Sequence, residues 1–526
     1  MVVDEVTIVT QEKRQMTSFS GPLPPRLFNM AEYVIGRAAR AAPDKIALIV
    51  VDDFGAAKPA ETWTFGDLEA AVLSIAGGLL ARGLVAGDRL LIRLDNTSAY
   101  ALLFFGAIAA GLVPIPASTQ LTEGEAEFLL ANSGARCVCA AWRRGHTANG
   151  YLVLDADEVD EMMCNVASRA ENYAPTLADT AAYMIYTSGT TSRPKGVLHA
   201  QRAAWGRRPM YEGWYGLTND DRVLHAGAFN WTYTLGAGLT DPWANGATAI
   251  VFTGDKQPHT WPRLIRESGA TLFAAVPSLY RQILKYAAPA PGDLGSLRHG
   301  LIAGERPPET LFDDWFAATG THLYEAFGMS EMSTYISSAP SVPRRPGFIG
   351  RAQPGRTIAI LPVEEGTAPL PPGNEGLIAV HRSDPGLMLG YWQRPEEDAE
   401  VQRGEWFVGG DLGVMDSDGY IAHHGRANDI MKAMGYRVAP QEIEAVIARF
   451  DGVAEVACAE VSVRKDVSVI GAFVVPVAGV ALNEGAVLAF AAEHLASYKC
   501  PRMVFVVDSL PRTANGKLRR KDLVAR

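Results

Sequence analysis

The sequence has 526 residues, more than one hydrophobic core usually supports, so we expect two or more domains. Hydrophobic residues make up 48% and charged residues 20%, as in an ordinary globular protein, and the net charge of −10 argues against a nucleic-acid partner. Its five cysteines are scattered without the spacing of a zinc site, so we expect them to be reduced and buried.

The first part of the chain predicts an α/β domain. Residues 1–17 are polar and charged without the apolar core of a signal peptide, which predicts a cytoplasmic protein. Between residues 45 and 142, apolar runs typical of strands alternate with helical patterns at 68–81 and 122–132, and the alternation continues after residue 247. Such alternation predicts a parallel sheet flanked by helices. The most apolar stretch, 99–117, is interrupted by glycines and prolines, so we interpret it as a buried helix running into a strand rather than a membrane span.

A loop rich in hydroxyl groups follows the apolar run at 181–185. Residues 186–196 read Tyr-Thr-Ser-Gly-Thr-Thr-Ser-Arg-Pro-Lys-Gly. Backbone N–H groups freed by glycine, hydroxyl groups and one lysine charge suit the triphosphate of a nucleotide. The spacing differs from a Walker A loop, because Pro194 precedes Lys195 and Gly196 follows it. Taken alone, this composition fits a flexible surface loop equally well.

The last part of the chain predicts a β-rich subdomain and then a compact domain. Short strand-like segments at 376–381 and 420–423 follow a region rich in Pro and Gly. His423 and His424 have no third ligand nearby, so we interpret them as hairpin residues rather than a metal pair. After residue 428 the pattern predicts a unit of about a hundred residues, large enough to fold on its own. We expect helices at 440–449 and 484–495 and strands at 454–461, 467–475 and 502–507.

The loop at 186–196 resembles the signature of the adenylate-forming superfamily, which includes acyl-CoA synthetases, firefly-type luciferases and peptide-synthetase adenylation domains. Four further segments resemble family motifs in the expected order: 324–331, 404–411, 425–444 and 511–517. The resemblance runs from near residue 30 to the C-terminus. It implies an N-terminal α/β domain with a β-rich subdomain over residues 1–427, and a small mobile α+β lid over residues 428–526.

The resemblance also implies the chemistry. A carboxylic acid attacks the α-phosphate of ATP, and a thiol then displaces AMP from the acyl adenylate, with the lid serving the two half reactions in turn. The implied cofactors are ATP, Mg²⁺ and coenzyme A, and the implied catalytic residues are Lys195, Lys517 and Glu331, of which Glu331 would bind the metal. The implied ATP-binding residues are Thr187, Ser188, Gly189, Thr190, Thr191, Lys195, Gly304, Glu305, Tyr324, Ser330, Asp411 and Arg426. Tyr324 would stack near the adenine, and Ser192 stands where the family usually has Gly.

The acyl group implies a separate set of residues. Phe-Asn-Trp-Thr-Tyr at 229–233 looks most like benzoate- or aminobenzoate-type CoA ligases. No Asp or Glu occurs between residues 223 and 239, which argues against amino-acid activation, because a buried ammonium group would lack a partner. The implied acyl pocket consists of Trp231, Thr232, Tyr233, Ala237, Ala303, Ala326, Phe327 and Met329. The implied CoA tunnel holds Gly435 and Tyr436, and Asn428 is the implied hinge.

The leading prediction is an ATP-dependent acid–CoA ligase that activates an aromatic, alicyclic or medium-length carboxylic acid. One alternative is an enzyme that loads the pantetheine thiol of a carrier protein, since the same tunnel would serve both acceptors. An alternative of another class is a noncatalytic nucleotide-binding protein. The resemblance leaves open a homodimer and acetylation of Lys517, which would remove the charge of that lysine.

Overall fold

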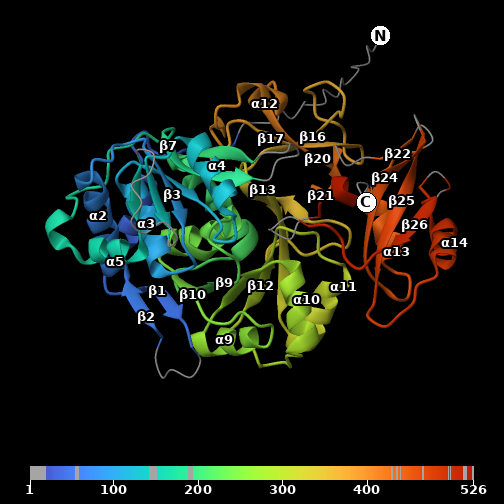
Figure 1. The fold of residues 1–526 in the computed structure, drawn as a ribbon, viewed down its shortest axis with the longest axis horizontal. Helices are drawn as coiled ribbons and strands as arrows, with labels where there is room; N and C mark the ends of the chain where they lie inside the picture. Colours follow the sequence, from blue (N-terminus) through green and yellow to red (C-terminus); the bar gives the residue numbers. More distant parts are fainter. Residues whose placement is uncertain are drawn as a thin grey trace, which may run out of the picture.

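The fold consists of a large body and a smaller lid at its C-terminal end (Figure 1). The computed structural model describes the chain except residues 1–18, 54–58, 141–150, 188–193, 428–430, 434–435, 439, 465–466, 496, 498, 513–517 and 524–526. Among the helices it describes, none is both long and apolar enough to cross a membrane.

The body is built on a 14-stranded sheet whose two halves differ in strand direction. One half is parallel and ends in an antiparallel edge strand, β2 (Glu61–Thr64). Its parallel strands, in spatial order, are β13 (His322–Met329), β12 (His299–Ile302), β11 (Leu272–Ala275), β9 (Arg222–His225), β10 (Thr248–Phe252) and β1 (Ile46–Val51).

The other half of the sheet is antiparallel, and it confirms the predicted β-rich subdomain. It continues from β13 through β14 (Ser333–Ser337), β15 (Gly350–Ala352), β21 (Tyr420–Arg426), β20 (Trp406–Met415), β17 (Glu375–His381) and β16 (Ile358–Leu361), with β19 (Gln402–Arg403) paired to β20. The change of direction at β13 places residues of both halves at the end of that strand.

Two smaller sheets complete the body. One is parallel and contains β4 (Val113–Pro116), β3 (Arg89–Arg93), β5 (Cys137–Ala140) and β6 (Leu152–Leu154). The other is antiparallel and contains β7 (Ala181–Thr187), β8 (Lys195–Ala200) and β18 (Gly390–Tyr391). All 12 residues of α3 (Ser98–Ala109) are buried and the chain continues into β4, so the prediction of a buried helix leading into a strand is confirmed.

Helices cover the sheets on both sides, and several begin where the sequence supplies a cap. The helices α2 (Phe65–Ala81), α4 (Glu123–Ser133) and α5 (Ala156–Cys164) each start with a reciprocal capping box. Together with α3 they flank the N-terminal strands (Figure 1). The remaining helices of the body are α1 (Arg37–Ala41), α6 (Arg208–Met210), α7 (Thr232–Leu235), α8 (Asp241–Ala244), α9 (Thr260–Ser268), α10 (Pro277–Tyr286), α11 (Thr310–Thr319) and α12 (Pro395–Glu400).

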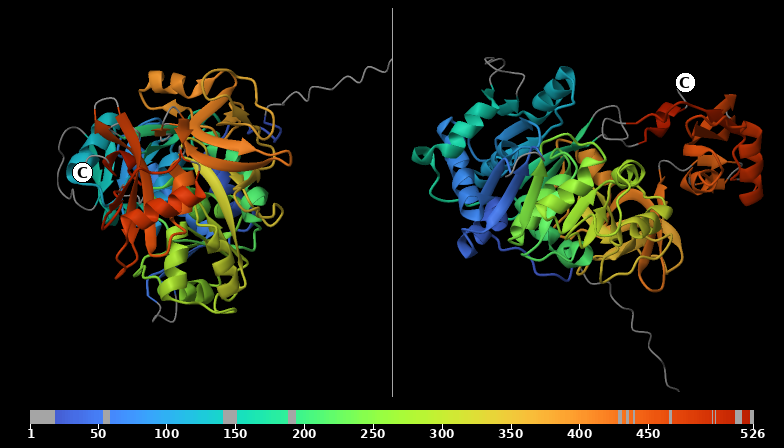
Figure 2. Two further views of the ribbon diagram at one scale, coloured as in Figure 1. Left: turned by 90° about the vertical axis from the view of Figure 1, so that its right-hand side faces the viewer. Right: turned by 90° about the horizontal axis from the view of Figure 1, so that it is seen from below.

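The lid has a hydrophobic core of its own, which includes Ile443, Ile447, Val474 and Val487. Its elements follow the predicted order and lie together at one end of the molecule (Figure 2). They are the hairpin of β22 (Met431–Ala433) and β23 (Tyr436–Val438), then α13 (Pro440–Ile447), β24 (Val453–Arg464), β25 (Val467–Pro476), α14 (Glu484–His494) and β26 (Met503–Val506). The predicted cut between residues 427 and 428 stays a prediction, because Asn428 lies outside the described residues.

Candidate active site

The predicted phosphate loop joins two antiparallel strands. Strands β7 and β8 pair antiparallel, and Thr187 and Lys195 are Cα partners in that pairing. Lys195 therefore stands at the base of the loop opposite Thr187. The predicted contacts of Ser188, Gly189, Thr190 and Thr191, and the substitution at Ser192, lie outside the described residues.

Lys195 is held by two residues that follow far along the chain. Its ammonium group forms an ion pair with the carboxylate of Glu397, and both side chains are 16% exposed. The ammonium group also lies 5.1 Å from the centroid of the Tyr391 ring. A mostly buried lysine charge at the base of such a loop has the position and the chemistry to neutralise a phosphate group.

Glu331 lies in the turn between β13 and β14, beside Ser330. Its Oε1 atom accepts a hydrogen bond of 2.8 Å from the hydroxyl of Tyr391, and its backbone oxygen accepts one of 2.8 Å from the N–H of Met388. No residue that the structure describes donates a hydrogen bond to Oε2 of Glu331. A carboxylate oxygen left open close to the phosphate lysine fits Mg²⁺, a hard cation that prefers carboxylate and phosphate oxygens.

Asp411 on β20 presents a buried oxygen atom that lacks a donor. The residue is 3% exposed, and its Oδ1 atom lies 3.0 Å from Nε2 of His423 and 3.5 Å from Nε of Arg426. Its Oδ2 atom is buried and has no hydrogen-bond partner among the described residues. An unpaired buried acceptor is costly, so this atom fits a ligand that donates hydrogen bonds, as the two hydroxyls of a ribose do.

The two aromatic residues of the 324–331 segment lie on opposite faces of β13. The Phe327 ring is 4.6 Å from the ring of His423, which places it on the side of Asp411. Tyr324 is half-buried against a different cluster, which includes Ala303 and Ala326. Phe327 is therefore the ring next to Asp411, the candidate for binding the ribose. This arrangement favours Phe327 over Tyr324 as the ring near the nucleotide.

The predicted acyl-pocket residues divide between two hydrophobic clusters. Ala237, Ala303 and Ala326 belong to one cluster, and Tyr233 packs against it. Phe327 and Met329 pack instead against the cluster beneath the antiparallel half of the sheet. Trp231 and Thr232 are partly exposed at the start of α7, which brings them next to Tyr233 but outside the buried cluster.

The hydroxyl of Tyr233 donates a hydrogen bond of 3.1 Å to the backbone oxygen of Leu301 at the end of β12. Two residues beyond that strand, Gly304 adopts φ +93°, a left-handed conformation that favours glycine. Glu305 next to it accepts a hydrogen bond of 3.4 Å from Ser278. Gly304 and Glu305, which the resemblance assigns to ATP binding, thus closely follow β12, whose backbone accepts the Tyr233 hydrogen bond.

Two histidines near the site were not predicted from the sequence. His225 ends β9 and packs edge-to-face against Tyr233, with ring centroids 4.4 Å apart. Its Nδ1 atom accepts a hydrogen bond of 2.9 Å from the N–H of Gly227, and burial lowers the pKa of His225 to about 3. His423 was assigned to a hairpin, and β21 forms a hairpin with β20, but the residue also contacts Asp411. The register of β20 and β21 shifts between Leu412 and Gly413, so His423 pairs with Gly413 and shares the face of Asp411, and no sequence pattern announced that shift.

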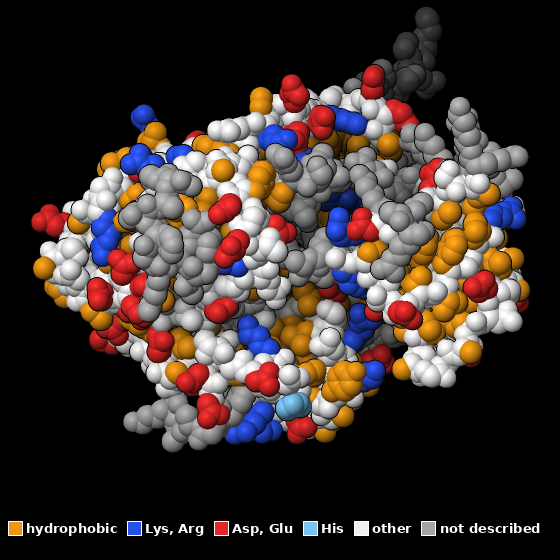
Figure 3. Space-filling model, in the orientation of Figure 1, with side chains coloured by type: hydrophobic (Ala, Val, Ile, Leu, Met, Phe, Trp, Pro, Cys, Tyr) orange, Lys and Arg blue, Asp and Glu red, His pale blue; other side chains and the backbone are white. Residues whose placement is uncertain are grey.

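The lid and the end of β21 that leads into it contribute less to the described site. Arg426, the last residue of β21, is the Cα partner of Asp411. Tyr436 begins β23, while Gly435, Asn428 and Lys517 lie outside the described residues. Lys and Arg side chains gather along the hollow between the body and the lid (Figure 3), a charge that suits phosphate groups.

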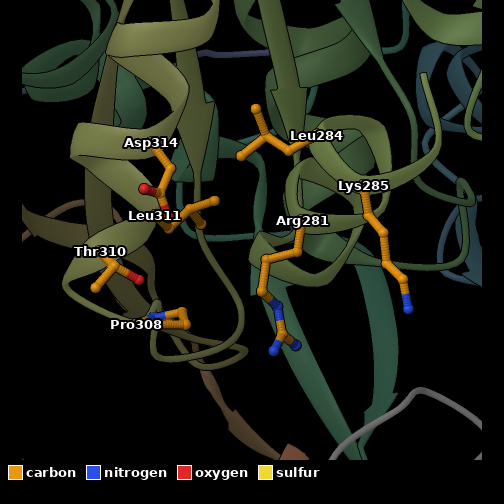
Figure 4. Close-up of a pocket in the computed structure, with 7 residues that line it drawn as sticks. All are labelled: Arg281, Leu284, Lys285, Pro308, Thr310, Leu311 and Asp314. Carbon is orange, nitrogen blue, oxygen red and sulfur yellow. The ribbon is translucent and has the colours of Figure 1, made fainter. Parts of the chain in front are cut away.

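A separate surface pocket of about 320 Å³ lies between α10 and α11 (Figure 4). Its lining contains none of the predicted site residues. The lining residues are Arg281, Leu284, Lys285, Pro308, Thr310, Leu311 and Asp314.

Comparisons with known proteins agree with this arrangement. A family model described as AMP-binding enzyme matches residues 35–392, and a model described as AMP-binding enzyme C-terminal domain matches residues 442–517. The chain belongs to the AMP-binding enzyme family. The predicted superfamily, the α/β fold class and the class of ATP-dependent, adenylate-forming enzyme are confirmed.

Several similar proteins span almost the whole chain. A 3-hydroxybenzoate–CoA ligase of Aromatoleum sp. (strain CIB) is 29% identical over 510 residues, which cover 94% of this chain and 95% of that protein. The structure of a benzoate CoA ligase from Burkholderia xenovorans LB400 is 29% identical with a TM-score of 0.83, covering 95% of this chain and 100% of that one. ATP-bound MatB from Rhodopseudomonas palustris is 27% identical with a TM-score of 0.86, covering 94% and 98%.

Proposed function

We propose that this protein activates an aromatic carboxylic acid as its acyl adenylate and transfers the acyl group to CoA, with release of AMP and pyrophosphate. The observation that carries the proposal is the apolar, aromatic cluster on the Tyr324 face of β13, the strand that ends two residues before Glu331. Its Trp214 ring stacks on Tyr233 with centroids 5.7 Å apart, and small residues such as Ala303 and Ala326 lie in the same cluster. Rings next to small side chains suit a flat apolar acid.

Among the described residues, the carboxylate that is hydrogen-bonded to this cluster is that of Asp241, and it already has its partners. Asp241 accepts a hydrogen bond of 2.7 Å from the hydroxyl of Tyr215, and it forms a buried ion pair of 2.7 Å with Arg207. Its charge is therefore compensated within the protein. Within the described part of this cluster a substrate ammonium group would find no unpaired carboxylate, which supports an acid without an amino-acid head group.

The nucleotide residues are assigned as follows. Lys195 and the loop above it hold the β- and γ-phosphates, and Asp411 accepts hydrogen bonds from the ribose hydroxyls. Glu331 holds Mg²⁺, which would supply charge neutralisation on the phosphates. Lys517 on the lid neutralises the charge that develops on the α-phosphate during adenylate formation.

The second half reaction depends on the lid. Rotation of the lid about Asn428 brings the segment of Gly435 and Tyr436 to the site. Because Gly435 has no side chain, the pantetheine arm can pass close to the backbone there. We propose a cytoplasmic location, with a homodimer and acetylation at Lys517 as further predictions. Loading of a carrier protein is the nearest alternative, because both acceptors present the same pantetheine thiol.

A panel assay tests the proposal. The purified protein is incubated with ATP, Mg²⁺ and CoA and with benzoate, 3-hydroxybenzoate, 2-aminobenzoate, cyclohexane carboxylate or octanoate, and AMP and the thioester are measured. We expect thioester formation with at least one benzoate. Turnover of cyclohexane carboxylate or octanoate alone would contradict the aromatic assignment, and AMP release without a CoA thioester would favour a carrier protein. No acid-dependent pyrophosphate release with any acid would favour a noncatalytic protein.

A further inference from the structure

Tyr391 comes from a distant part of the chain and is placed beside the phosphate loop by strand pairing. The short strand β18 pairs with β8, so that Tyr391 lies opposite Val197. The N–H of the next residue, Trp392, donates a hydrogen bond of 2.7 Å to the backbone oxygen of Gly196. The backbone N–H of Tyr391 itself donates one of 2.8 Å to Asp398. These contacts fix the backbone of Tyr391 against the base of the loop.

The side chain of Tyr391 lies against Lys195, which is assigned to the phosphates, and against Glu331, which is assigned to the metal. Its hydroxyl donates to Oε1 of Glu331 at 2.8 Å, and the ammonium group of Lys195 lies 5.1 Å from its ring centroid. The face of an aromatic ring attracts a cation, and a neutral hydroxyl donates to a carboxylate, so the two contacts are compatible. A tyrosine hydroxyl is neutral at physiological pH, so it carries the proton that it donates.

We propose that Tyr391 is a positioning residue for the metal and phosphate site: its hydroxyl fixes Oε1 of Glu331 and so directs Oε2 toward Mg²⁺, while its ring orients Lys195 toward the phosphates. The inference rests on the proposed role of Glu331. A carboxylate held on one oxygen has lost most of its rotational freedom before the metal arrives. Removing such an outer hydrogen bond typically lowers metal affinity or activity about 10- to 100-fold.

The test separates the hydroxyl from the ring. Calorimetry measures the binding of a non-hydrolysable ATP analogue, with Mg²⁺ and with EDTA, to the wild type, to Tyr391→Phe and to Tyr391→Leu. Mg²⁺ should raise the affinity of the wild type for the ATP analogue, and in Tyr391→Phe this gain is expected to be about tenfold smaller. The affinity measured with EDTA should be the same in both proteins. Tyr391→Leu is expected to weaken metal-free binding as well, because Lys195 loses the ring beneath it.

Tyr420→Phe is the matched control. Its hydroxyl donates a hydrogen bond of 2.9 Å to the backbone oxygen of Pro343, away from the residues assigned to phosphate, so both affinities should stay at the wild-type values. If Mg²⁺ raised the affinity of Tyr391→Phe for the ATP analogue as much as it raises that of the wild type, the proposal would be overturned. Equal loss with and without Mg²⁺ in that variant, accompanied by a lower melting temperature, would also overturn it, because the role would then be structural. The measurement needs no acid, so failure of the acid panel leaves it interpretable.

Discussion

Replacing Asp411 with Ala tests the nucleotide site most directly. Oδ2 of this residue is buried without a donor among the described residues, while Oδ1 is already near His423 and Arg426. If both ribose hydroxyls donate to the charged carboxylate, each bond is worth about 1.5–3 kcal/mol. Loss of two such bonds costs about 3 kcal/mol or more, which corresponds to a roughly 100-fold weaker affinity. Asp411→Asn keeps one oxygen acceptor but loses the charge, so we expect an intermediate loss of about tenfold.

Adenosine is the appropriate ligand, because it carries the ribose without phosphates or metal. Calorimetric titration of adenosine and of ATP into Asp411→Ala should show the same loss of binding free energy for both ligands. Asp416→Asn is the control on the same hairpin, since Asp416 is ion-paired with Arg345 at 2.5 Å. Wild-type adenosine affinity in Asp411→Ala would refute the assignment of this carboxylate to the ribose.

Three further predictions concern the acyl site, the lid and the pH dependence of stability. Ala303→Phe fills the apolar cluster, so the ratio of kcat/KM between benzoate and bulkier acids should rise while ATP affinity is retained; an unchanged acid profile would contradict the assignment. Lys517→Ala should abolish adenylate formation but still convert supplied acyl adenylate to the thioester. Gly435→Leu should form the adenylate but fail to convert it to the thioester. Equal damage to both half reactions in both variants would exclude a two-state lid. Burial, and secondly the nearby charge of Lys256, lower the pKa of His225 to about 3. The buried neutral imidazole therefore resists protonation in the folded state, so the free energy of unfolding should not depend on His225 above pH 6.5. Between pH 6.5 and pH 3 it should fall by up to about 1.4 kcal/mol per pH unit, because only the unfolded state binds the proton there. Urea unfolding should show a shallower acid loss in His225→Gln, and an identical pH profile would disprove this.

The lid shows how much of the fold is available from local patterns. The predicted strand at 454–461 corresponds to β24 (Val453–Arg464), which runs three residues further. The predicted strand ends at Val461, but backbone pairing with β25 continues to Arg464 opposite Val467. A strand can extend through exposed residues such as Val463 once its partner is in register, so hydrophobic periodicity locates an element better than its ends.

The site shows where local patterns stop being informative. Strands β7 and β8, which flank the predicted phosphate loop, are adjacent along the chain, so their pairing is a local contact. The partners of Lys195 could not be found in this way. Tyr391 and Glu397 reach it because β18 pairs with β8, a contact between distant segments that no periodicity specifies. The charged environment of the loop is therefore a property of the tertiary structure.

The predicted roles of Tyr324 and Phe327 remain predictions, and the alternation of side chains along β13 bears on both of them. Successive side chains of a strand point to opposite faces, so residues three apart cannot share a face. Since Tyr324 and Ala326 lie on the face of the apolar cluster, Phe327 must point the other way, toward His423 and Asp411. A role for Tyr324 at the adenine and for Phe327 in the acyl slot would require the reverse arrangement. The geometry therefore favours exchanging the two roles, with Phe327 at the nucleotide and Tyr324 at the acid.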